Sequence, residues 1–130
     1  MALFDADWMV AFGEAWNNEP ELSGALAEIG FNSAIGYGFP GDDAPQGFIN
    51  VENGMVTSAG AYNGEELNWD IRAKEDQWNK WIAKPPGMTG LGMAFTTGKM
   101  KFVVGDYGAM VKDPRMAGPF IKSFAVMAQV

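Results

Sequence analysis

The sequence predicts an α+β domain in which a mainly antiparallel sheet of five strands is flanked by helices. Apolar residues recur at helical spacing in the first 30 residues and again after residue 74, and between them they alternate with small or polar residues. Two Asn-Gly pairs, at 53–54 and 63–64, are typical of tight hairpins and divide the alternating region into strands. A length of 130 residues favours a single domain spanning residues 1–130.

The first 30 residues predict two helices. Trp8, Phe12 and Trp16 repeat every four residues, so the first helix presents an aromatic stripe to an apolar neighbour. After a break at Pro20, residues 20–29 again repeat apolar side chains at helical spacing. The chain is therefore expected to open with a helical pair.

Alternation predicts a first strand at residues 31–39, with large side chains on one face and with Gly36 and Gly38 on the other. Glycines on one face of a strand allow another segment to pack closely there. Three more strands complete an antiparallel meander through the Asn-Gly turns: 47–51, 55–62 and 67–73. In the last of these strands, Asp70 and Arg72 are expected on a solvent-exposed face.

The second half of the chain returns to a helical pattern. Trp78, Trp81 and Ile82 lie on one side of a helix that begins near Lys74 and ends before a Pro-Pro-Gly sequence. Residues 87–93 are apolar and glycine-rich, so we expect them to form a mobile loop or a frayed turn. The remaining elements are a fifth strand, a short helix and a closing helix, expected at 99–104, 107–112 and 117–130.

Composition excludes several classes of function. The chain contains neither cysteine nor histidine, so it has no thiolate nucleophile, no imidazole base and no cysteine-ligated metal. A net charge of −7 disfavours binding to nucleic acid. No apolar run is long enough for stable membrane insertion, and the acidic N-terminus is unlike a signal peptide, which favours a cytoplasmic location. No cofactor or metal motif is recognised.

Four short motifs follow one another between residues 69 and 124. They are the Trp78-x-x-Trp81 helix, the Ala94-Phe95 step, Gly98-Lys-Met-Lys-Phe102, and Gly105-Asp106. This order resembles the sterol carrier protein-2 (SCP-2) family. The resemblance implies that the five-stranded sheet and its helices enclose an apolar tunnel, and that the protein binds fatty acyl chains, sterols or other lipids. One residue more than the usual family spacing lies between Lys101 and Gly105, which predicts a β-bulge.

These observations predict binding or transport of an apolar or amphipathic small molecule, such as a lipid, a fatty acyl chain or a sterol-like compound, without catalysis. Methionine and aromatic side chains adapt to irregular apolar ligands, and the chain has nine Met, nine Phe and five Trp. From their positions in the expected elements, the candidate ligand-binding residues are Ile35, Phe48, Trp69, Trp78, Met93, Phe95, Phe120, Phe124 and Met127.

Other interpretations stay open at this stage. The chain could instead be a protein-interaction or dimerisation module, accessory to an enzyme system, with its apolar surface meeting a partner or a second copy. An enzyme with a carboxylate base would need an acid facing the apolar site, whereas the pattern places the acids on turns or exposed faces. Lys99 and Lys101 share one face of the fifth strand, where they either meet solvent or lie near an anionic headgroup.

Overall fold

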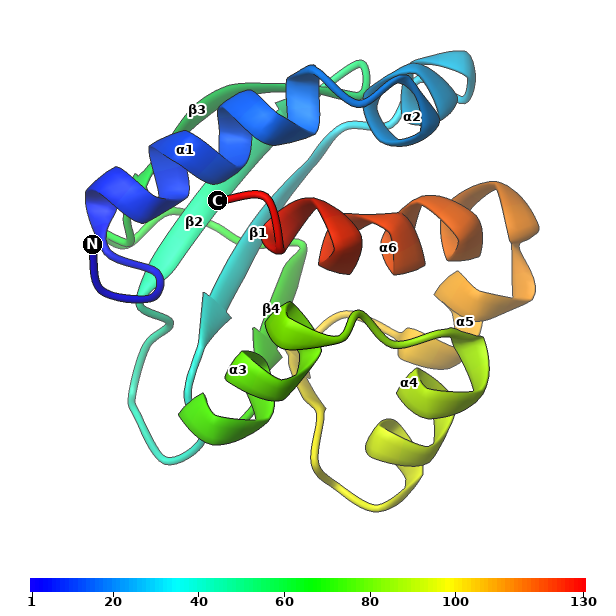
Figure 1. The fold of residues 1–130 in the computed structure, drawn as a ribbon. Helices are drawn as coiled ribbons and strands as arrows, with labels where there is room; N and C mark the ends of the chain where they lie inside the picture. Colours follow the sequence, from blue (N-terminus) through cyan, green and yellow to red (C-terminus); the bar gives the residue numbers. More distant parts are fainter.

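The computed structural model describes residues 1–130 and contains one five-stranded sheet with helices packed on it (Figure 1). The strands lie in the order β3-β2-β1-β4-β5. Their bounds are β1 Ser33–Gly38, β2 Gly47–Glu52, β3 Met55–Ala61, β4 Trp69–Arg72 and β5 Lys101–Val104. The helices are α1 Ala6–Asn17, the π-helical turn η1 Pro20–Gly24, α2 Ala25–Glu28, α3 Glu75–Ala83, α4 Met88–Thr96, α5 Tyr107–Lys112 and α6 Pro114–Met127.

Only the first part of the expected meander forms. β1, β2 and β3 are antiparallel neighbours, and Asn53 and Gly54 make the tight turn between β2 and β3 with φ of 51° and 85°. β4 does not pair with β3. It lies on the other side of β1 and runs parallel to it, so the prediction of a four-stranded antiparallel meander is wrong.

The two glycines of β1 account for this crossover. We call the sheet face that packs against α1 and α6 the inner face, and the opposite one the outer face. On the outer face, a Cβ at Gly36 would lie 2.8 Å from Leu67 Cδ1, and one at Gly38 would lie 2.9 Å from Pro45 Cα. The close packing expected from the glycines is confirmed. It lets the connections at 39–46 and 62–68 cover the outer face, and the second of them delivers the chain to the far edge of β1.

Asp70 and Arg72 are buried beneath the first of these connections. Arg72 Nε and Nη2 donate to the two carboxylate oxygens of Asp70 at 2.6 and 2.9 Å, and Arg72 Nη1 donates to the carbonyls of Phe39 and Asp42. The expected solvent-exposed face of this strand is therefore wrong. The 39–46 connection excludes water from it, and the ion pair is tolerated there because its hydrogen bonds are satisfied.

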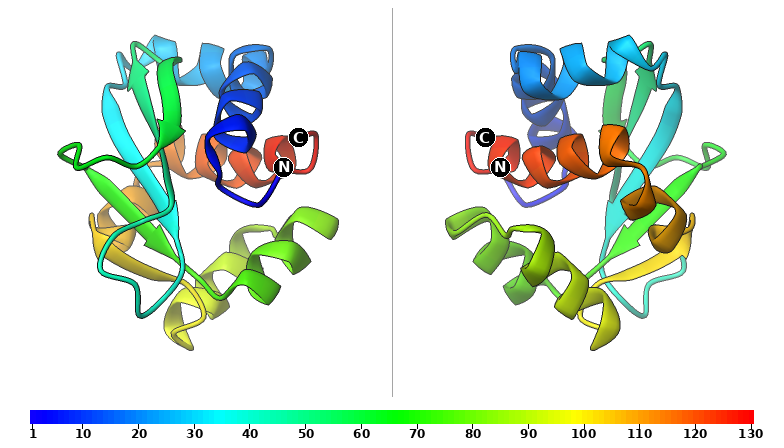
Figure 2. Two further views of the ribbon diagram at one scale, coloured as in Figure 1. Left: turned by 90° about the vertical axis from the view of Figure 1, so that its left-hand side faces the viewer. Right: turned by 90° about the vertical axis from the view of Figure 1, so that its right-hand side faces the viewer.

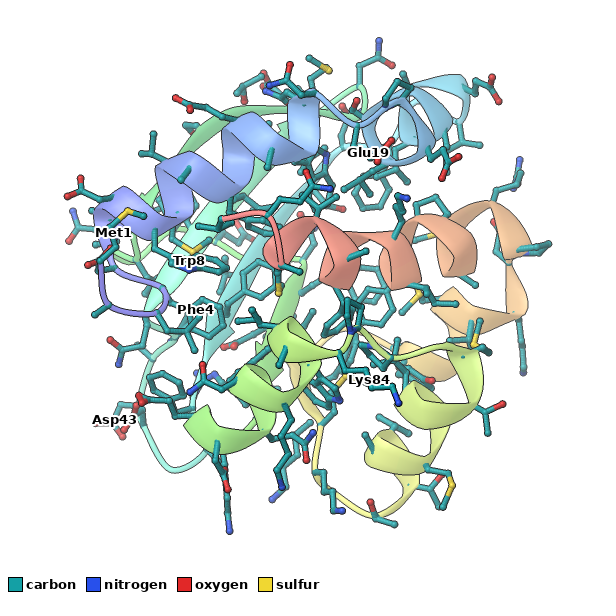
Figure 3. All side chains as sticks on the ribbon, in the orientation of Figure 1. Met1, Phe4, Trp8, Glu19, Asp43 and Lys84 are labelled. Atoms are coloured by element: carbon teal, nitrogen blue, oxygen red, sulfur yellow. The ribbon has the colours of Figure 1, made fainter.

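Helices cover the inner face of the sheet (Figure 2). α1 crosses β2 and β3 with its aromatic stripe inward, and the Asp5 carboxylate caps it by accepting from the Trp8 backbone N–H at 2.8 Å. Phe4 also turns inward below α1 (Figure 3) and meets the Trp78 ring edge-on at a centroid distance of 5.0 Å. α6 lies between α1 and α3, so the main aromatic core joins the N-terminal segment to the second half of the chain.

Three helical segments differ from expectation. Residues 20–29 form a π-helical turn followed by a short α-helix. The expected mobile loop at 87–93 is wrong, because these residues begin the helix α4, whose Leu91 and Ala94 are buried. The last helix begins at Pro114 instead of residue 117, since proline fits a first turn and Asp113 caps it.

The expected bulge in the fifth strand is confirmed. Ile71 lies opposite Phe102 while its neighbour Asp70 lies opposite Val104, so Val103 is the additional residue. The strand begins at Lys101, two residues later than the sequence pattern suggests. None of the helices combines the length and the apolar character that a membrane span requires.

Candidate functional site

An apolar cavity of about 50 Å³ lies between the inner face of the sheet and α6. Of the 14 residues around it, 12 are hydrophobic and none is charged. They come from both halves of the chain: Trp16, Leu22, Leu26, Phe31, Ile35, Tyr37, Trp69, Ile71, Phe102, Met110, Met116, Pro119, Phe120 and Ser123.

The strands supply the floor of the cavity. Ile35 and Tyr37 of β1 lie opposite Trp69 and Ile71 of β4 in the parallel ladder, so all four side chains point to the inner face. Phe102 extends this row because it lies opposite Ile71 on β5. The floor therefore depends on the parallel pairing of β1 with β4.

α6 supplies the roof. Four residues of α6 form one stripe of the helix along the cavity: Met116, Pro119, Phe120 and Ser123. Apart from the adjacent Pro119 and Phe120, neighbouring members of the stripe are three or four residues apart. Pro119 has no backbone N–H, so the carbonyl four residues before it lacks its helical hydrogen bond. The roof therefore includes the part of α6 that is held least firmly by its own backbone.

Aromatic rings line the side of the cavity that is nearest to solvent. Trp69, Phe102 and Phe120 are each half-buried, and the Phe102 ring lies 6.0 Å from that of Trp69 and 6.1 Å from that of Phe120, measured between centroids. Trp69 is oriented by its indole N–H, which donates to Ser33 Oγ at 3.2 Å. Together with the half-buried Phe31 and Met116, these rings form what we call the rim of the cavity.

Apart from the indole N–H groups of Trp16 and Trp69, the polar side-chain groups in the lining are the hydroxyls of Tyr37 and Ser123. Ser123 Oγ donates to the carbonyl of Phe120 within α6. The Tyr37 side chain is buried, and desolvation raises the pKa of its hydroxyl above the usual value, which keeps the phenol neutral. No group of three or more Asp and Glu side chains is placed to hold a metal ion. The cavity offers apolar contact and hydrogen bonding, without ionic contacts.

The structure brings three of the nine candidate residues to this cavity: Ile35, Trp69 and Phe120. Trp78, Phe124 and Met127 lie in the adjoining core instead, each no more than 1% exposed, and the Trp78 and Phe124 rings stack at a centroid distance of 6.1 Å.

The other three candidates lie away from the cavity. Phe48 is on the outer face, opposite Gly36 in the antiparallel ladder. Met93 and Phe95 are exposed on α4, where the Phe95 ring stacks on Tyr107 at 4.3 Å between centroids.

Sequence reasoning omitted most of the lining. For Tyr37, Ile71 and Phe102 the signal was present, because strand alternation places them on the same face as Ile35 and Trp69. Met110 and Met116 carry no comparable signal, since each lies in a short or terminal helical turn whose direction depends on the tertiary fold.

No protein-family model matches this sequence, and no curated protein matches it. Solved structures do match. A crystal structure of sterol carrier protein 2 superposes with a TM-score of 0.78 over 99% of both chains, at 18% identity. A conserved hypothetical protein from Thermus thermophilus, described as a candidate sterol carrier protein, gives a TM-score of 0.69 over 98% of this chain and 91% of its own, at 18% identity. The ubiquinone synthesis protein UbiJ-SCP2 gives 0.59 over 94% and 88%, at 9% identity.

These likenesses extend over almost the whole chain, including the N-terminal helices that the sequence motifs did not reach. The expected architecture, a mainly antiparallel five-stranded sheet flanked by helices, is also observed directly. The chain has the α+β fold of sterol carrier protein 2.

Proposed function

We propose that this chain binds an apolar or amphipathic small molecule, such as a lipid, in the cavity beneath α6 and carries it without altering it. The observation that supports this proposal most strongly is a space between sheet and helix that is bounded by 12 hydrophobic residues and no charged residue. The fold shared with sterol carrier protein 2 agrees with a lipid-like ligand.

A lipid requires more room than the empty cavity provides. The cavity measures about 50 Å³, whereas an engineered cavity of about 150 Å³ accepts one benzene molecule. Widening is least costly at the rim, where Met116 and Phe120 are half-buried and where Pro119 weakens the helix. We propose that this part of α6 moves outward when the ligand enters, which opens the tunnel implied by the fold.

Ligand binding can be tested with an apolar fluorescent probe on delipidated protein. Each buried methylene contributes about 0.8 kcal/mol, so displacement by acyl chains should strengthen from octanoate to palmitate. Salt should change the affinity little, because the cavity has no ionic partner. Native mass spectrometry of the purified protein should show a co-purified lipid. Equal affinity along the whole series would refute a tunnel that binds the chain.

A pair of substitutions on α6 tests the location. Met116 and Ile121 are both half-buried on this helix, but only Met116 lines the cavity. We expect Met116→Trp to obstruct the rim and weaken probe binding, while Ile121→Trp leaves it unchanged. Equal effects of the two variants would place the ligand elsewhere.

Catalysis is not part of this proposal. A carboxylate base for an apolar substrate would have to face the cavity, and no lining residue is acidic. The buried acid Asp70 is on the outer face, where Arg72 holds both of its oxygens. An assay for turnover should therefore return the bound ligand chemically unchanged.

A second function, a protein-interaction or dimerisation module, is favoured by one surface feature. Met88, Met93 and Phe95 of α4 and Val103 and Val104 of the edge strand β5 are large apolar side chains that are at least 40% exposed. Light scattering of the purified protein separates the two functions. A dimer that takes up no probe supports the module, and a monomer that binds the probe supports the carrier.

A further inference from the structure

We propose that the hydroxyl of Tyr37 is the polar anchor of the ligand, and that the ligand therefore carries a neutral oxygen, a hydroxyl or a carbonyl, on its apolar body. This inference rests on the proposed function, because it names a chemical feature of the molecule that occupies the same cavity.

The Tyr37 side chain is held in a fixed position. Tyr37 is 3% exposed and points from β1 into the inner core. Its ring is surrounded by those of Phe4, Phe12 and Trp78, with centroids 5.7, 5.7 and 6.1 Å away. Rings on several sides prevent the side chain from turning toward solvent, so the hydroxyl must find a partner inside the molecule.

The Tyr37 hydroxyl has no hydrogen-bond partner in the protein. The buried indole N–H groups of Trp16 and Trp78 each donate to a backbone carbonyl at 2.9 Å, and the Tyr62 hydroxyl donates to the carbonyl of Glu65. Tyr37 makes no such bond. Every fully enclosed side-chain polar atom of the molecule is hydrogen-bonded, so the Tyr37 oxygen must border open space. Tyr37 is one of the residues that line the cavity, and the proposal places its hydroxyl at that space.

A ligand oxygen can satisfy the Tyr37 hydroxyl more readily than a buried water molecule can. A buried water molecule normally makes two to four hydrogen bonds, and the only other hydroxyl in the lining is that of Ser123. A ligand oxygen satisfies the phenol without needing further polar partners if its remaining atoms are apolar. An unpaired buried hydroxyl is unfavourable, so ligand binding would remove a penalty that the empty protein carries.

The lining of the cavity does not suit a charged anchor group. No Lys or Arg lines the cavity, and a carboxylate placed beside Tyr37 would be buried without a counter-ion. Burial also keeps the phenol neutral. An alcohol or a ketone fits this site, whereas the carboxylate of a fatty acid would have to remain outside the rim.

Tyr37→Phe tests the anchor, because it removes the oxygen and retains the ring. The probes are 1-octanol and octane, measured by competition with the fluorescent probe. We expect the affinity ratio of octanol to octane to fall by about 3- to 10-fold in the variant, which corresponds to one net hydrogen bond. Tyr62→Phe is the matched control, since its hydroxyl is bonded outside the cavity, and it should leave the ratio unchanged.

The possible outcomes are distinct. An unchanged ratio with both probes bound overturns the anchor and leaves the proposed function standing. Failure of the wild type to bind either probe overturns both. Denaturation without ligand gives an independent reading: Tyr37→Phe should be at least as stable as the wild type, and a clear loss of stability would mean that the hydroxyl already has a partner in the empty protein.

A second cleft, lined in part by residues of α3, supports a separate inference. A cleft of about 380 Å³ between α3 and the turn before β5 is lined by 11 residues, which include Lys74, Lys80, Lys99 and Lys101. These four lysines are exposed and none of them forms an ion pair, and Asp76 is the one acid in the lining. Unpaired cations gathered in one hollow are unexpected in a chain of net charge −7.

We infer that this cleft binds a phosphate-bearing molecule. Each ammonium group offers three donors, and a phosphate group offers several acceptor oxygens and more than one negative charge, so one phosphate can satisfy more than one lysine. A hollow of this volume suits a small molecule or a headgroup better than a flat surface would.

Pyrophosphate provides the direct test, followed by amide NMR at low salt. We expect shifts confined to residues 74–80 and 97–101, and affinity that falls as salt is added. The variant Lys80→Gln/Lys99→Gln should weaken binding about fivefold or more. Lys84→Gln/Lys112→Gln changes the net charge equally outside the cleft and should have little effect. Binding to phosphatidylglycerol vesicles but not to pyrophosphate would assign the phosphate to a lipid headgroup. If neither pyrophosphate nor the vesicles bind, or if the two double variants weaken binding equally, the proposed site is overturned.

Discussion

Trp78 connects several parts of the core. Its side chain is fully buried, its indole N–H donates to the Gly38 carbonyl at 2.9 Å, and its ring contacts Phe4, Trp81 and Phe124. Trp81 is also buried, but its indole N–H has no such bond and it is 6% exposed. One residue of α3 therefore links this helix both to the sheet and to α6.

We predict that Trp78→Ala lowers the free energy of unfolding by about 3–5 kcal/mol and that Trp81→Ala lowers it by less. The first variant leaves a larger cavity and also removes one of the two donors to the Gly38 carbonyl, the other being the Ala73 N–H. Urea denaturation of the two variants measures the difference, and equal losses would contradict it.

A pH effect is predicted for Tyr37, whose pKa is raised by burial. In the unfolded chain tyrosine ionises near pH 10. Between that pH and the higher folded pKa, the native state holds one proton more than the unfolded state, so stability falls as pH rises. The wild type should therefore lose stability relative to Tyr37→Phe above about pH 10 and not below about pH 9. A constant difference across this range would contradict the burial of the phenol.

At the scale of elements, the β2–β3 hairpin is fastened to the helices at its turn. The Gly54 carbonyl accepts from the Trp16 indole N–H at 2.9 Å. A Cβ at Gly54 would lie 2.4 Å from the backbone nitrogen of Ala27 and 2.5 Å from the carbonyl oxygen of Ser23. The turn thus presses against the backbone of η1 and α2, which also line the cavity.

Gly54→Ala should destabilise the protein by roughly 2–5 kcal/mol, through both backbone strain and this collision. Gly64 provides the control. It also has a positive φ, of 89°, but open space surrounds it, so Gly64→Ala should cost only about 1–2 kcal/mol. Thermal denaturation of the two variants compares them, and similar losses would mean that the hairpin is not packed tightly on the helices.

For the two glycines inside α4, replacement by alanine is expected to stabilise the protein. Gly90 and Gly92 lie inside this helix with no positive φ, and a Cβ at either position would come no closer than 3.5 Å to a neighbour. Gly90→Ala and Gly92→Ala should each stabilise the protein by about 0.5–1 kcal/mol. Hydrogen exchange should slow in residues 88–96 of the double variant. Destabilisation would mean that this segment does not form the helix.

At the scale of the whole molecule, a single domain remains a prediction that denaturation can test. The aromatic core joins residues from Phe4 to Phe124, so no part of the chain keeps a separate core. We expect tryptophan fluorescence and far-ultraviolet circular dichroism to report one coincident transition in urea. Two separated transitions would show that the two halves unfold independently.

Local patterns predicted most elements, because period and turn chemistry act over a few residues. The stripe of Trp8, the Asn53-Gly54 turn and the bulge before Gly105 are examples. Partners that are distant in sequence were harder to predict. Nothing near Asp70 indicates that a remote loop covers it, and the alternation of β4 is the same whether it pairs with β3 or with β1.

The dependence on partners that are distant in sequence also explains why only three of the nine candidate residues line the cavity. Side-chain size and approximate face correctly indicate Ile35, Trp69 and Phe120. Separating Trp78, in the solid core, from Tyr37, beside the cavity, requires knowing where α6 crosses the sheet. That position depends on packing between elements from opposite ends of the chain.

The floor and the roof of the cavity come from different parts of the sequence, so the order of synthesis determines when the cavity can form. Residues 1–61 emerge first and complete α1 and the three antiparallel strands, which leaves one edge of β1 open. β4 then closes that edge, but the part of both strands that α6 covers stays exposed until residues 114–127 leave the ribosome. A shorter nascent chain exposes an apolar sheet surface that no helix covers, which favours aggregation or chaperone binding. Under the proposed function, the ligand site is therefore complete only when the last helix has docked.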